Sequence, residues 1–83
     1  MGYLQGFNDC DCATDVVREL RAAREQHPNP FHSAHEGFAV LQEEVDELWE
    51  VVRKKGCTKQ RMREEAVQIA AMALRFIEDV CDR

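Results

Sequence analysis

Two long amphipathic segments joined by a short polar turn decide the fold of this chain: residues 41–80 read LQEEVDELWEVVRKKGCTKQRMREEAVQIAAMALRFIEDV. In both segments apolar residues recur every three or four positions, which is the spacing of one face of an α-helix. Each predicted helix has about 23 residues and is roughly 34 Å long. Because the connection between them is short, we expect an antiparallel helical hairpin.

The ends of these two helices carry recognisable capping residues. Ser33 is followed three positions later by Glu36, which together form a capping box at the start of the earlier helix. This helix is expected to continue to about Lys55, with Gly56 as its C-cap. Thr58 is expected to cap the later helix, which runs to about residue 80.

Each helix of the hairpin carries an apolar stripe. The stripe of the earlier helix consists of Ala34, Phe38, Leu41, Val45, Leu48 and Val52. The stripe of the later helix consists of Met62, Ala66, Ile69, Ala73, Phe76, Ile77 and Val80. Between Ala66 and Ala73 the later helix is apolar nearly all round, so it should be buried from more than one side.

The segment before the hairpin predicts one more helix, from about Asp11 or Thr14 to Gln26, ended by His27 and Pro28. Residues 1–10 are expected to form a loose arm. Strand and hairpin-turn signals are almost absent, so we expect a single all-α domain over residues 1–83.

Three helices cannot surround the apolar later helix, and a domain of this size is marginal on its own. We therefore expect two hairpins to pair across a two-fold axis into a four-helix core, giving a homodimer or a higher homo-oligomer.

Composition narrows the range of partners. The chain has 83 residues, a mass of 9.6 kDa and a net charge of −5. This acidic balance argues against binding to nucleic acid or to an anionic membrane. No apolar run approaches the length of a membrane span, and no secretory signal is visible, so we expect a cytoplasmic protein whose four cysteines are reduced.

An acidic cluster stands out on the earlier helix, where residues 43–50 hold five carboxylates in eight positions. Glu44 and Glu47 share one helical face and flank the apolar stripe. On the later helix Glu65 and Gln68 have the same spacing. Like charges at these spacings destabilise a helix by a few tenths of a kcal/mol per pair, so a purely solvent-facing role would favour interspersed lysines.

The expected hairpin register places Glu44 opposite Gln68, and Glu47 opposite Glu65. Three carboxylates and one amide oxygen then converge, which is the ligand set typical of magnesium or manganese. The alternative is a solvated acidic face with intrahelical ion pairs such as Glu50 with Lys54.

The two segments at 41–49 and 64–73 resemble the MazG-like nucleoside triphosphate pyrophosphohydrolases, an all-α superfamily, over about residues 31–80. The family has Glu-x-x-Glu on one helix and Glu-x-x-Asp on the next. Glu44 and Glu47 match the first motif and Glu65 begins the second. Gln68 stands where the family has Asp.

The resemblance implies a magnesium-dependent enzyme that cleaves nucleoside triphosphates between the α- and β-phosphates, releasing a monophosphate and pyrophosphate. Glu44, Glu47 and Glu65 would be the catalytic residues, and together with Gln68 they would hold Mg²⁺, with Mn²⁺ as a substitute. One carboxylate or a metal-held hydroxide would activate the water.

Cationic side chains around the turn are candidates for binding the phosphates, namely Lys54, Lys59 and Arg61. Their alternative role is that of solvated charges at helix ends. A different class of function also stays open: a non-catalytic helical dimer that binds a nucleotide or a protein partner, with its metal site weakened by Gln68.

Overall fold

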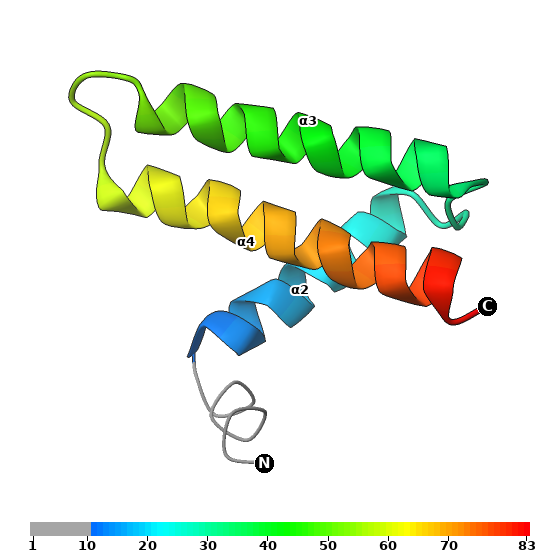
Figure 1. Cartoon of the computed structure of the whole chain (residues 1–83). Helices are drawn as coiled ribbons and strands as arrows, with labels where there is room; N and C mark the ends of the chain where they lie inside the picture. The colour runs from blue at the N-terminus through cyan, green and yellow to red at the C-terminus, as the bar shows by residue number, and fades with distance from the viewer. Residues whose placement is uncertain (1–10) are drawn as a thin grey trace, which may run out of the picture.

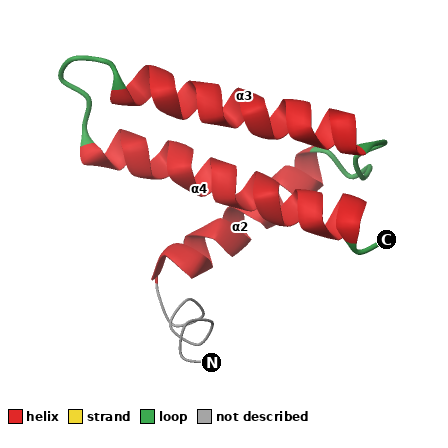
Figure 2. Cartoon of the chain, in the orientation of Figure 1, coloured by secondary structure: helices red, strands yellow, loops and turns green. Residues whose placement is uncertain are grey.

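The computed structural model describes residues 11–83, so the expected N-terminal arm at residues 1–10 lies outside the described part. The elements are α2 (Asp11–Gln26), α3 (Ala34–Val52), α4 (Lys59–Phe76) and a π-helical turn, η1 (Ile77–Cys81). Within this part every regular element is helical, which confirms the all-α prediction (Figure 2). None of these helices combines the length and the apolar character that crossing a bilayer requires.

Helices α3 and α4 run antiparallel and form the predicted hairpin, and α2 crosses α4 obliquely (Figure 1). Helix α4 packs against both of the others, α3 on one side and α2 on another. The apolar circumference of α4 is therefore covered from two sides, as its sequence predicted.

The N-terminal caps follow the sequence. The Ser33 hydroxyl accepts a hydrogen bond from the Glu36 backbone N–H at 3.1 Å, and the Glu36 carboxylate in turn accepts one from His32 N–H at 3.0 Å. The Thr58 hydroxyl accepts from Arg61 N–H at 3.2 Å. These bonds satisfy amide groups that have no partner inside their own helix.

The C-terminal boundaries differ from the prediction. Helix α3 ends at Val52 with Arg53 as C-cap, three residues before Lys55. Gly56 does adopt a positive φ of 82°, but in the turn beyond the helix and not at its cap. The intervening residues form successive turns, in which Cys57 N–H donates to the carbonyl of Lys54 at 3.3 Å. The predicted helix was too long because Gly56 was taken as its C-cap, whereas the last residue of the apolar stripe, Val52, is also the last residue of α3.

The buried core lies where α2, the connector at residues 27–33 and the C-terminal half of α4 meet. Its apolar members are Ala13, Val16, Phe31, Ala71 and Met72. Gly37 lets α3 approach this region closely, because a Cβ atom at this position would lie 2.7 Å from the Phe76 ring and 3.1 Å from the Phe31 ring.

The apolar stripe predicted for α3 faces α4 only in part. Phe38 is 60% exposed, Val45 41% and Val52 46%, while Leu41 and Leu48 are half-buried at its edge. The side turned toward α4 carries Gly37, Val40, Leu41, Glu44, Leu48 and Val51. The close approach at Gly37 accounts for this rotation, since only the glycine side of α3 can reach the Phe76 ring.

Candidate metal centre

Three carboxylates from two helices converge on one point of the hairpin. Glu44 and Glu47 come from α3 and Glu65 from α4, and each offers an oxygen within 4.8 Å of those of the other two. We call these three residues the carboxylate cluster. The register predicted from the turn placed Glu47 opposite Glu65 and Glu44 opposite Gln68, and the three convergent carboxylates suit a hard divalent cation with oxygen ligands.

The electrostatics of the cluster favour a bound cation. Burial, followed by the negative charges of Glu47, Glu65 and Glu43, raises the pKa of Glu44 to about 7. A protonated Glu44 donates a hydrogen bond to Glu47, which contributes to the same shift. A divalent ion between the carboxylates would relieve this repulsion and favour their charged forms.

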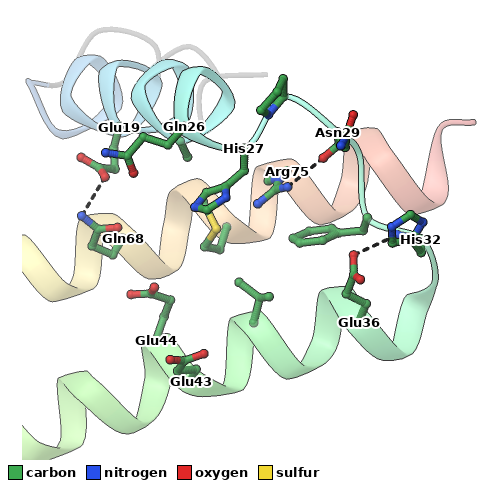
Figure 3. Close-up of a pocket in the computed structure, with 15 residues that line it drawn as sticks. Glu19, Gln26, His27, Asn29, His32, Glu36, Glu43, Glu44, Gln68 and Arg75 are labelled. Carbon is green, nitrogen blue, oxygen red and sulfur yellow. Dashed lines mark hydrogen bonds between the residues drawn. The ribbon is translucent and has the colours of Figure 1, made fainter.

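Gln68 lies about one turn further along α4, on the wall of the same cavity as Glu44. Its amide nitrogen donates a hydrogen bond to the carboxylate of Glu19 on α2 at 2.7 Å (Figure 3). Three of the four predicted ligands are therefore close to one another, and the fourth is engaged with α2. Sequence analysis missed Glu19, although its position between Val16 and Ala23 on the apolar face of α2 was a signal.

A cavity of about 590 Å³ opens beside Glu44, between α2, the connector, α3 and α4. We call it the connector-side cavity. Figure 3 shows His27 pointing into it from the connector and Glu44 from α3. Its floor includes Phe31 and Met72, which are 3% and 5% exposed. The volume lies in the range of small-molecule sites.

A buried ion pair forms one end of this cavity. Arg75 donates to the Asn29 carbonyl at 3.1 Å, and its guanidinium lies 4.1 Å from the centre of the Phe31 ring. Asp79 lies 3.5 Å from Arg75 Nε and accepts hydrogen bonds from Phe31 N–H and Arg24, each at 3.2 Å. Sequence analysis missed this pair, although the four-residue spacing of Arg75 and Asp79 was visible.

A second cavity, of about 460 Å³, lies between α3 and α4 nearer the turn. We call it the turn-side cavity. Lys54 and Arg61, two of the predicted phosphate ligands, line it, whereas Lys59 lines neither cavity. Arg61 also reaches the cluster, with a nitrogen 3.7 Å from Glu65.

Glu50 also lines the turn-side cavity, and its ion-pair partner is Arg53, at 2.8 Å, in place of the Lys54 that the sequence suggested.

Comparison of the chain with models of protein families, with curated proteins and with solved structures finds no match in any of the three.

Proposed function

We propose that the protein hydrolyses a nucleoside triphosphate to a monophosphate and pyrophosphate with the help of Mg²⁺. The observation that supports this most strongly is the convergence of Glu44, Glu47 and Glu65 within 4.8 Å. The resemblance of the two helices to the MazG-like pyrophosphohydrolases points the same way. The cationic side chains beside the cluster suit a polyphosphate substrate.

The three carboxylates would hold the ion, which when bound supplies charge neutralisation for the triphosphate. Water forms a bond from its oxygen to the α-phosphorus, and the bond from this phosphorus to the bridging oxygen breaks. Pyrophosphate leaves with the electron pair, and a carboxylate of the cluster accepts the proton released by water. Both products carry the charges expected for hydrolysis, so no further reactant is needed.

Gln68 distinguishes this chain from a site with four carboxylates. An amide oxygen is a ligand without charge, so the ion is held more weakly than by Asp at the same position. We therefore expect activity to need a higher concentration of Mg²⁺ than it would with four carboxylates at the site. Gln68→Asp should tighten manganese binding, although it also removes the hydrogen bond from Gln68 to Glu19.

Release of pyrophosphate from the common ribo- and deoxyribonucleoside triphosphates, with and without Mg²⁺, tests the proposal. Glu44→Gln and Glu47→Gln should each abolish turnover while the fold is kept, because the amide preserves shape and removes charge. Asp46→Asn, an exposed neighbour on the same helix, is the matched control and should leave turnover unchanged. Full activity in either glutamine variant would contradict the proposed site.

We also propose that two copies pair through the exposed apolar face of α3, completing a four-helix core. Phe38, Val45, Trp49 and Val52 lie along one side of this helix and are 41–60% exposed in the single chain. Contiguous apolar surface of this kind marks an interaction site. The non-catalytic alternative is a dimer that binds metal and nucleotide without turnover, and the pyrophosphate assay distinguishes it from the enzyme.

A further inference from the structure

The carboxylate cluster lies at the boundary between the two cavities. Glu44 lines the connector-side cavity, and Glu47 and Glu65 line the turn-side cavity. Because oxygens of all three lie within 4.8 Å of one another, the two cavities meet at the cluster. A ligand whose middle part is held at the carboxylates would therefore extend into both.

The turn-side cavity is cationic apart from the cluster itself. Its walls carry Arg53, Lys54 and Arg61, and the single further carboxylate among its lining residues is Glu50. Arg53 neutralises that carboxylate through hydrogen bonds of 2.8 and 3.2 Å. Arg61 lies 3.5 Å from Glu64 and 3.7 Å from Glu65, so among the described residues Lys54 is the lining cation that makes no salt bridge and can pair with a negatively charged group.

The connector-side cavity has the opposite character. Apart from the cluster, three carboxylates line it, those of Glu19, Glu36 and Glu43, against one cation, Arg75. These carboxylates would repel a polyphosphate. The buried Phe31 and Met72 beside them, together with His27 and amide groups, suit a neutral, planar and partly polar group.

Resting on the proposed function, we propose that a nucleoside triphosphate binds in one direction along this groove. The nucleoside occupies the connector-side cavity, the α-phosphate lies at the carboxylate cluster, and the β- and γ-phosphates occupy the turn-side cavity. Hydrolysis then leaves the two products in separate cavities, the monophosphate beside the connector and pyrophosphate beside the turn.

Arg75 forms a fixed part of the wall of the connector-side cavity. Its side chain is 7% exposed, and its Nε makes no hydrogen bond, although it lies 3.5 Å from Asp79. The Phe31 ring and the Asn29 carbonyl hold the guanidinium in place at the cavity wall. Because Nε is buried and faces Asp79, which does not line the cavity, this side chain shapes the wall and does not offer Nε to a bound base.

Chemical-shift mapping of backbone amides tests the direction of binding directly. The uniformly ¹⁵N-labelled chain in Mg²⁺ is titrated separately with inorganic pyrophosphate and with each common nucleoside monophosphate. Pyrophosphate should shift amides of residues 50–61, and a monophosphate should shift those of Gln26, His27, Asn29, Phe31, His32 and Arg75. Reversed patterns, shifts from both products in one cavity, or no shifts from either would overturn the proposal.

Matched variants give a second readout. Lys54→Gln should raise the Kd for pyrophosphate about tenfold and leave that for the monophosphate within about twofold, since one charge-assisted contact is lost. Lys59→Gln, which lies outside both cavities, is its control. His27→Ala should weaken only the monophosphate, with His35→Ala as its control. If Lys54→Gln and His27→Ala each weaken both products equally, the assigned direction is wrong.

The same experiments keep the two proposals apart. Turnover without separate product cavities would contradict the direction of binding and leave the enzymatic proposal intact. Separate product cavities without turnover would contradict the enzymatic proposal and support the direction of binding. The protein would then be one that binds a nucleotide without hydrolysing it.

Discussion

The two ends of the α3–α4 hairpin are held in different ways. Near the connector, α2 covers α4, and all the buried residues of the described chain lie outside residues 38–70. Toward the turn, α2 reaches α4 through the Arg63–Asp15 ion pair and the Gln68–Glu19 hydrogen bond, each 2.7 Å long, and no residue between 38 and 70 is buried. The carboxylate cluster and the exposed Trp49 lie in this second region, whereas the exposed Phe38 follows Gly37 near the connector.

This contrast indicates which parts of the molecule are complete in one chain. The connector end has a core, a buried ion pair and close helix contacts. The turn end has like charges placed together and apolar surface left uncovered, both of which are unfavourable without a partner. A cation and a second copy of the chain would supply what this end lacks.

The largest effect should come from breaking the buried ion pair at the connector end. Asp79→Ala leaves Arg75 buried without its carboxylate and removes the acceptor of Phe31 N–H. We expect a loss of about 3–5 kcal/mol in the free energy of unfolding, measured by urea denaturation. Glu78→Ala, next in sequence and half-exposed, should cost about 1 kcal/mol or less. Equal losses would show that the connector end is not held by this pair.

Trp49→Glu tests the uncovered face at the other end. Trp49 is 60% exposed, so a charge at this position should leave the fold of the single chain intact. The same charge would weaken an apolar interface between two copies. We expect dimer affinity to fall by about 2–4 kcal/mol, measured by sedimentation equilibrium. Ala39→Glu, an exposed position on another side of α3, should have little effect. A wild-type chain that is monomeric at micromolar concentration would contradict the dimer proposal.

Gly37→Ala tests the close approach that sets the rotation of α3. The added methyl group would lie 2.7 Å from the Phe76 ring, so this ring or one of the two helices must shift. We expect a loss of about 1–3 kcal/mol in stability by urea denaturation. Gly56→Ala is the comparison, because a Cβ atom at Gly56 would have no other atom within 4 Å. Only the positive φ opposes this substitution, and we expect it to cost about 1–2 kcal/mol of stability. Unchanged stability in Gly37→Ala would remove the explanation for the rotation.

Much of this fold was predictable from local signals. The Ser33 and Thr58 caps and the periodicity of the three helices follow from the sequence, and the turn fixes the register that brings Glu47 beside Glu65. The rotation of α3 was not predictable, because it depends on one contact between Gly37 and Phe76, far apart in sequence. Glu19 was missed for a similar reason, since its bond to Gln68 joins residues 49 positions apart.

A smaller effect is expected from the titration of Glu44. Burial and neighbouring carboxylates raise its pKa to about 7, so the folded chain keeps a proton that the unfolded chain releases near the ordinary carboxyl pKa of 4.5. Without metal, the contribution of Glu44 to stability should therefore be greatest below the unfolded pKa and be lost as pH rises through about 7.

After allowance for solvent screening of this half-buried group, we expect this loss to be about 1 kcal/mol, and Glu44→Gln should abolish it. Urea denaturation at about pH 5 and about pH 8 in chelator measures the difference. Excess Mg²⁺ should reduce this pH-dependent loss of stability in the wild type, because the ion favours the charged carboxylates. An identical pH dependence in Glu44→Gln would show that another group titrates.

Calorimetric titration of Mn²⁺ into the wild-type chain and into Glu47→Gln tests the central claim most directly, that the turn end is a metal centre. We expect saturable binding at the cluster in the wild type, and affinity about tenfold or more weaker in Glu47→Gln, because one charged ligand is lost. Asp46→Asn should bind like the wild type. Equal affinities in the wild type and Glu47→Gln, or no binding to either, would contradict the claim.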